Sequence, residues 1–225
     1  MKKPICFLAL LFVLFSCGES IRFEQAQPAG IPELSKIPKK LRGTYMEGDT
    51  IYLVIGKKTI IERSEGTISE TLEEIAKDIS EDDEEIIISD SSSRGFKAHY
   101  EDEKAMIQVR FDKAGNGSFE WSEEQFALGP KNIIKSKDGA YYINIFRPQD
   151  SAWILRKLVL KGDRLTTYKV DNPREIADLE AITPVKKHYK KDGDSDGWTI
   201  DPTPEVLEEL FEKYGEKVKS YRKVK

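Results

Sequence analysis

Short apolar segments separated by turn residues dominate the chain from residue 41 onward. In residues 105–111 every second position, from Ala105 to Phe111, is apolar, which is the period of two expected of a strand with one face in a core. The glycine-containing residues 113–117 follow and lead into another strand-like segment. This combination predicts a β-hairpin.

The same pattern recurs, with turns at intervals of roughly 8 to 12 residues, which is typical of sandwiches and barrels and not of sheets with helical crossovers. Further strands are predicted at residues 41–46, 50–55, 59–63, 118–121, 132–135, 141–146, 153–160, 165–170, 185–189 and 198–200. The sequence therefore predicts a mainly β domain, an antiparallel meander that is either barrel-like or a strongly bent sheet.

Three short helices are expected to interrupt the strands. Apolar residues recur at helical spacing over residues 68–79, and residues 67–70 have the pattern of a capping box. A second helix is predicted at residues 173–182. The strongest signal lies at residues 204–214, where Thr203 suits the N-cap and the apolar positions share one face. It predicts a C-terminal amphipathic helix.

The beginning of the chain resembles the export signal of a bacterial lipoprotein. Two lysines precede an apolar run at residues 5–15, which is too short to span a bilayer and has the length of a signal-peptide core. The run ends at Ser16 and Cys17, a small residue and a cysteine placed as in a lipobox. The resemblance implies that residues 1–16 are a lipoprotein signal peptide and that Cys17 is acylated.

Acylation of Cys17 would anchor the protein to a membrane without a transmembrane helix. Residues 17–39 contain prolines and glycines and no sustained apolar period, so we expect a flexible tether there. A single β-rich domain is expected at residues 40–215, followed by a basic tail at residues 216–225. Lipoprotein sorting retains chains with Asp after the cysteine at the inner membrane, so Gly18 favours the outer membrane and leaves the leaflet open.

Composition limits the chemistry of this domain. The chain has 36 Lys and Arg against 40 Asp and Glu, a net charge of −4, which argues against a nucleic-acid partner. The chain has two cysteines, and Cys6 lies in the signal peptide while Cys17 carries lipid. The mature domain would therefore have no free thiol, which excludes disulfides, cysteine-bound zinc and cysteine nucleophiles.

Residues 41–45, Leu-Arg-Gly-Thr-Tyr, resemble the start of a lipocalin-like (calycin-like) β domain, with Tyr45 in place of the usual Trp. From residue 132 to residue 211 the pattern of strands and short helices is also similar to that of uncharacterised bacterial envelope lipoproteins. A lipocalin-like barrel implies a small apolar ligand in its mouth. The expected lining residues are Ile107, Val109, Phe111, Tyr141, Ile143 and Ile145.

Asp192, Asp194 and Asp196 stand at alternate positions before Gly197, as in the first half of an EF-hand calcium loop. The twelfth position is Thr203, which offers no bidentate carboxylate. A polar turn between two strands accounts for the same residues, so both interpretations stay open.

Other candidate groups favour structural roles. The five acids at residues 81–85 suit a solvated loop, and the serine-rich residues 89–93 lack the frame of a hydrolase nucleophile and are expected to form a loop. The two histidines, His99 and His188, are too few for a three-histidine zinc site. The basic residues near the C-terminus suit a frayed end or a contact with anionic lipid.

The sequence as a whole favours a lipid-anchored cell-envelope protein with a binding or structural role, without cofactor or catalytic residues. In one version a barrel carries a small apolar ligand. In the alternative, the core is packed and the surface binds an envelope protein. An envelope hydrolase that uses a pair of carboxylates is the second alternative, and we do not expect an enzyme, because no nucleophile, base and orienting group assemble from the sequence.

Overall fold

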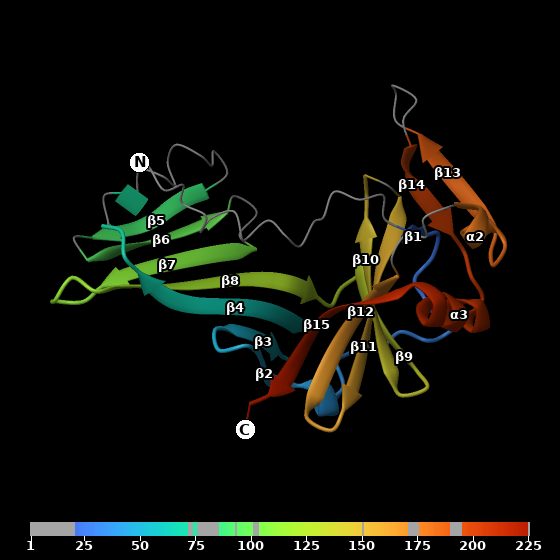
Figure 1. The fold of residues 1–225 in the computed structure, drawn as a ribbon, viewed down its shortest axis with the longest axis horizontal. Helices are drawn as coiled ribbons and strands as arrows, with labels where there is room; N and C mark the ends of the chain where they lie inside the picture. The colour runs from blue at the N-terminus through green and yellow to red at the C-terminus, as the bar shows by residue number, and fades with distance from the viewer. Residues whose placement is uncertain are drawn as a thin grey trace.

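Most of the chain from Ile21 to Val224 belongs to one large, mainly antiparallel β-sheet (Figure 1). The computed structural model describes residues 21–71, 74–75, 86–92, 94–100, 104–149, 151–170, 176–189 and 195–224. Within these residues the strands at the two ends of the sheet order, β13 and β5, do not pair with each other. The predicted mainly β fold is confirmed, in the form of a strongly bent sheet that is not closed.

Three meanders supply most of the strands. The first contains β2 (Gly43–Glu47), β3 (Ile51–Ile55) and β4 (Thr59–Ile68). The second contains β5 (Ile86–Ser92), β6 (Gly95–Tyr100), β7 (Ala105–Phe111) and β8 (Gly117–Ala127). The third contains β9 (Asn132–Lys137), β10 (Ala140–Arg147), β11 (Ala152–Lys161) and β12 (Arg164–Val170).

Long-range pairings join the meanders into one sheet. Strand β4 pairs with β8, and the last strand, β15 (Gly215–Lys223), lies between β12 and β2. A small ladder of three strands is attached to β11 through β1. It contains β1 (Ile21–Phe23), β13 (Val185–Tyr189) and β14 (Ser195–Ile200), with β1 parallel to β14.

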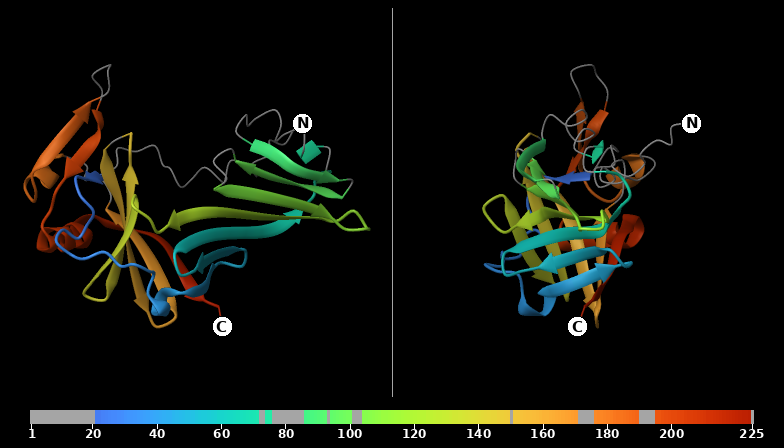
Figure 2. Two further views of the ribbon diagram at one scale, coloured as in Figure 1. Left: turned by 180° about the vertical axis from the view of Figure 1, so that it is seen from behind. Right: turned by 90° about the vertical axis from the view of Figure 1, so that its left-hand side faces the viewer.

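Strands β4 and β8 are longer than the alternating pattern predicted, and their far halves carry the second meander away from the rest of the molecule (Figures 1 and 2). We call the arm residues 62–68 of β4 and 117–123 of β8 together with β5, β6 and β7, and the remainder the body. The arm and the ladder of β1, β13 and β14 lie at opposite ends of the molecule (Figure 1).

The N-terminal part of the described chain is not a tether. Ile21 and Phe23 alternate in β1 and fill the core beside Ile200, and Ile37 is fully buried. The amide of Ile37 donates to the carbonyl of Lys57 at 2.9 Å. The tether expected at residues 17–39 is therefore wrong from Ile21 onward. Its few apolar residues are buried in the core, and its backbone forms hydrogen bonds with the sheet.

The basic tail is also corrected. Residues 216–223 belong to β15, which pairs with β12 along most of its length and with β2 at its end. Tyr221 is buried in the main core, while its neighbour Arg222 is exposed. The sheet thus extends beyond both ends of the domain expected at residues 40–215.

The described helices agree in part with the predictions. Helix α3 (Pro204–Tyr214) begins at its N-cap Thr203, whose side chain accepts a hydrogen bond from the Val206 amide, and it buries one apolar face, as predicted. Helix α2 (Ile176–Glu180) lies within the helix predicted at residues 173–182 and ends at Glu180, and residues 173–175 lie outside the described residues. A short 3-10 turn, η2 (Lys39–Leu41), precedes β2.

The expected capping box at residues 67–70 is wrong. Strand β4 runs on to Ile68, and the reciprocal hydrogen bonds of a capping box join Thr71 and Glu74 instead. The amide of Ile75 bonds to the carbonyl of Thr71 at 3.1 Å, as in a first helical turn. The remainder of the helix expected at residues 68–79 lies outside the described residues.

Three apolar clusters form the core. The largest fills the concave side of the bent sheet in the body, and the second lies between α3 and the opposite face of β10 and β11. The third belongs to the arm. The six residues expected to line one ligand cavity are divided: Tyr141, Ile143 and Ile145 belong to the largest cluster, and Ile107, Val109 and Phe111 to that of the arm.

Candidate functional site

The arm has one apolar and one polar face. Across β4, β8 and β7, paired residues in register share a face of the sheet. Phe119 and Val109 belong to the row that is packed in the arm's apolar cluster, and Glu65 and Glu120 belong to a row on the other face. This other face is predominantly polar, and we call it the polar face of the arm. Its described residues on β4, β8 and β7 are Arg63, Glu65, Thr67, Ser118, Glu120, Ser122, Met106, Gln108 and Arg110.

A shallow depression lies on this part of the arm. It is lined by Thr50, Glu65, Gly66, Gln108, Arg110, Ser118, Phe119 and Glu120. Glu65 and Glu120 are direct cross-strand partners, and Glu120 is in turn opposite Gln108. Two like charges placed opposite each other disfavour a sheet, so this pair offers a place for a positively charged group from outside.

Neighbouring groups moderate the two carboxylates without neutralising them. Tyr52 donates its hydroxyl hydrogen to Glu65 at 3.1 Å, and this hydrogen bond raises the pKa of Tyr52. The Arg63 guanidinium lies 3.9 Å from Glu120, with both side chains about half exposed. A contact of that length between exposed groups contributes little.

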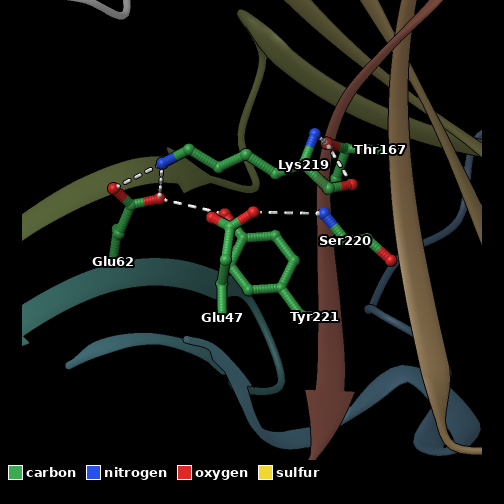
Figure 3. A network of polar contacts seen from close by, with 6 residues as sticks. All are labelled: Glu47, Glu62, Thr167, Lys219, Ser220 and Tyr221. Carbon is green, nitrogen blue, oxygen red and sulfur yellow. Dashed lines mark hydrogen bonds and ion pairs between the residues drawn. The ribbon is translucent and has the colours of Figure 1, made fainter. Parts of the chain in front are cut away.

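A second polar cluster lies where the arm meets the body (Figure 3). Glu62 points from β4 into the interior and is 6% exposed. It accepts two hydrogen bonds from the Lys219 ammonium, at 2.9 and 2.8 Å, and one from the Tyr221 hydroxyl at 3.0 Å. Burial, followed by the charge of Glu62, raises the pKa of Tyr221. The tyrosine therefore stays protonated and serves as a donor.

This cluster interrupts the apolar core between body and arm. On the same face of β4, Ile60 belongs to the core of the body and Ile68 to that of the arm, and Glu62 and Ser64 stand between them. The polar groups of Glu62 are satisfied by β15, so the cluster stabilises the position at which the arm leaves the body. Sequence analysis missed Glu62, because a single acid in a strand carries no signal of burial.

A third cluster fixes helix α3 to the sheet. Glu208 accepts hydrogen bonds from Tyr142 of β10 and Lys157 of β11, and the lysine also lies over the rings of Tyr142 and Phe211. Burial alone would raise the pKa of Glu208, but the hydrogen bonds from Lys157 and Tyr142 outweigh it and lower that pKa. Burial, followed by the bond to Glu208, raises the pKa of Tyr142.

A fourth cluster holds the N-terminal segment, which we call the strap (residues 24–37). Lys135 is 6% exposed and donates to the carbonyls of Ala26 at 2.6 Å and Pro28 at 3.0 Å. Asn144 and the backbone of Gln27 exchange two hydrogen bonds, at 2.6 and 2.8 Å. Burial lowers the pKa of Lys135. Lys135 and Asn144 form these hydrogen bonds with backbone groups of the strap, which indicates that both residues have a structural role.

The strap also covers an edge of the sheet. Strand β9 pairs with β10 on one side only, and on its other side Leu34 donates its amide to the carbonyl of Ile134 at 2.9 Å. The same segment reaches the β3–β4 turn through Ile37 and Lys57. The strap therefore bridges part of the gap that a closed barrel would have filled with a strand.

The residues singled out from sequence do not converge. The residues outside the described part of the chain include Cys17, Asp192, Asp194 and the acids at residues 81–85. Asp196 is the second residue of β14 and lies at an irregularity in the pairing of β13 with β14. The serine-rich segment expected as a loop is a strand over residues 89–92, within β5.

The two histidines stand on separate strands. His99 lies on β6 in the arm and His188 on β13 in the ladder, where its Nε2 contacts the Thr199 hydroxyl. In the part of the chain that the structure describes, no three His, Cys, Asp or Glu side chains gather as metal ligands would. A search of these same residues finds no helix with the length and apolar character needed to cross a bilayer.

Comparison with known proteins yields no relative: no family model, no curated protein and no solved structure matches this chain.

Proposed function

We propose that this protein is a lipid-anchored component of the bacterial cell envelope, held by acylated Cys17, that acts by binding another envelope protein. The arm is the surface that makes the contact. Of the two versions that the sequence left open, the packed one is supported by one observation above all: the residues expected around a single ligand cavity belong to two separate packed clusters. A carrier of an apolar ligand would need them around one interior space.

The depression on the arm suggests the chemistry of the partner. Its lining includes the opposed carboxylates of Glu65 and Glu120, with Gln108 opposite Glu120. A lysine or arginine side chain placed between the two carboxylates would relieve their repulsion and form charge-assisted hydrogen bonds. We therefore propose that the partner presents a basic side chain to this depression. The acylated cysteine holds the protein at the outer membrane, where the partner is met.

Site-directed photo-crosslinking in the native envelope tests this function. A photoreactive amino acid replaces Gln108 in the depression, and in a matched control it replaces Lys161, the exposed last residue of β11 in the body. We expect a discrete crosslinked protein from position 108 and none from position 161. The double variant E65Q/E120Q should lose that product while the protein remains folded.

Four results would each contradict part of the proposal. Equal crosslinking from positions 108 and 161, or an unchanged product in E65Q/E120Q, would remove the arm as the binding surface. A discrete apolar molecule that copurifies with the protein in native mass spectrometry would instead support the ligand carrier. For the anchor, C17A should lose labelled fatty acid, and retention of the label would contradict acylation at Cys17.

A further inference from the structure

Three segments that are distant in sequence meet at one end of the body. The amide of Lys223, at the end of β15, donates to the carbonyl of Asp163 in the β11–β12 turn at 2.8 Å. The amide of Val224 donates to the carbonyl of Thr44 in β2 at 2.8 Å, and the turn η2 directly precedes β2. The β11–β12 turn, the end of β15 and η2 therefore lie together, at the end of the body where Figure 1 marks the C-terminus.

Exposed basic side chains gather at this end. Lys161, the last residue of β11, is the cross-strand partner of Arg164, which is in turn opposite Arg222 of β15. All three side chains belong to exposed residues and form one row across three strands. Lys39 and Lys40 of the neighbouring turn η2 are exposed as well. We call these five residues the basic end.

The fold gains little from this row, because like charges that are direct cross-strand partners disfavour a sheet. Arg222 lies 3.9 Å from the Asp163 carboxylate, and the two side chains are 70% and 69% exposed, so the contact contributes little. Lys40 lies over the Tyr141 ring at 5.1 Å, which leaves its positive charge in place.

The basic end is positive on a chain whose net charge is −4. Asp163 is the single acid in residues 39–42, 161–164 and 222–224. The five basic residues therefore form a concentration of positive charge that suits an anionic partner from outside.

The placement of these residues favours a broad anionic surface over a single bound ion. They belong to a turn and to the ends of strands, so they are spread over the rim of the sheet. Guanidinium groups bind phosphate oxygens through paired N–H donors. Anionic phospholipid headgroups attract clustered Lys and Arg side chains, and a bilayer presents them over an area that all five residues can reach.

From these observations we propose that the basic end docks on the anionic phospholipid headgroups of a bilayer. The inference rests on the proposed function only because the acylated cysteine brings the protein to a membrane. The contact is made by the folded domain itself, and it is separate from both the lipid at Cys17 and the depression on the arm.

Sedimentation with vesicles tests this contact in the absence of the anchor. The chain of residues 18–225, which keeps every residue that the structure describes, is mixed with vesicles of phosphatidylglycerol and phosphatidylcholine or of phosphatidylcholine alone. The variant is R164Q/R222Q. The matched control is K113Q/K186Q, which removes the same charge from exposed lysines of the arm and of β13.

We expect the wild type and the control to bind the anionic vesicles severalfold more tightly than R164Q/R222Q does. Binding should weaken as salt is added and should be absent on phosphatidylcholine alone. Because the substitutions remove a repulsion, the urea midpoint of R164Q/R222Q should equal or exceed that of the wild type. The variant K39Q/K40Q tests the same end without changing a strand, and it should also bind more weakly.

Equal binding by R164Q/R222Q and the control would overturn the inference. Binding of polyglutamate without binding of vesicles would also overturn it, because the partner would then be an acidic protein segment. Since the chain in this experiment carries no lipid, its failure leaves the anchor and the arm untouched. Those are tested separately by the C17A variant and by crosslinking from position 108.

Discussion

Lys219 donates from its ammonium nitrogen to both carboxylate oxygens of Glu62, and thereby joins the last strand of the chain to a strand 157 positions earlier. Both side chains are largely buried. The pair lies at the base of the arm, together with the Tyr221 hydroxyl. Because this polar pair lies between the apolar core of the body and that of the arm, it fixes how these two cores are arranged.

Breaking this pair from one side should destabilise the protein strongly. In K219M the Glu62 carboxylate stays buried with the Tyr221 hydroxyl as its donor, and loss of one partner of a buried pair costs about 3 kcal/mol. The double variant E62Q/K219M removes the uncompensated charge and should regain part of that loss. Urea unfolding measures both, and a K219M midpoint equal to that of the wild type would show that the pair contributes nothing.

Acid should weaken the attachment of helix α3. The pKa of Glu208 is lowered in the folded protein, so the unfolded chain binds its proton first as the pH falls. The stability that Glu208 contributes is complete above the ordinary carboxyl pKa of about 4.3 and is lost as the pH falls through the lower folded value. We expect the unfolding free energy of the wild type to decrease more steeply below about pH 5 than that of E208Q. Parallel curves would contradict the assignment.

A strongly alkaline pH should destabilise the folded protein through two buried tyrosines, Tyr142 and Tyr221. The pKa values of Tyr142 and Tyr221 are raised, chiefly by burial, so both stay protonated in the folded state when the unfolded chain ionises. Their contribution is complete below the ordinary tyrosine pKa of about 10 and decreases as the pH rises above it. The variant Y221F should unfold with a weaker dependence on pH above about 10. An unchanged slope would contradict a buried, protonated Tyr221.

The strap should open separately from the rest of the sheet when its lysine is removed. In K135M the carbonyls of Ala26 and Pro28 lose their donor, at a cost of about 1–3 kcal/mol. Hydrogen exchange should accelerate at the Gln27 and Leu34 amides and remain slow in β10 and β11. The matched control is K161M, which changes the exposed lysine at the end of β11. Uniform acceleration across the sheet would show that the strap is not an independent unit.

Truncating the chain tests whether residues 216–223 are needed as a strand or are a dispensable tail. A chain that ends at Gly215 lacks the pairing of β15 with β12 and β2, and it removes Tyr221 from the main core. We expect it to lose cooperative unfolding and to bind a hydrophobic dye. A chain that ends at Val224 should unfold like the full-length protein. Cooperative unfolding of the chain that ends at Gly215 would instead show that residues 216–223 behave as a tail.

How far the sequence predicts this fold depends on where each stabilising contact comes from. The alternation of residues 105–111 determines the buried face of β7 by itself, and Thr203 determines the start of α3 locally. The second half of β4, with Glu65 and Thr67, carries little apolar alternation and is a strand because β8 pairs with it. Those contacts are distant in sequence and leave no local pattern.

The strap and the arm show the same limit for the candidate site. Gln27 is held by Asn144 at a separation of 117 positions, so residues that read as a polar tether are ordered by a partner that no local pattern reveals. Nothing in the sequence distinguishes Glu65 and Glu120 from the other acids. They form a pair because the register of β4 and β8 places them opposite each other. The resemblance of Ser16 and Cys17 to a lipobox is a local pattern, so acylation can be predicted from the sequence alone, whereas the proposed binding surface depends on strand pairing.

The place of β15 in the sheet also sets the order in which this protein is completed. The ladder of strands passes from the third meander to the first through the last nine residues of strand structure that the chain makes. Until these residues have been synthesised, β12 and β2 both present open edges, which are prone to pair with other chains. A nascent or prematurely terminated chain is therefore an aggregation risk, and the topology creates a need for chaperones until β15 is in place.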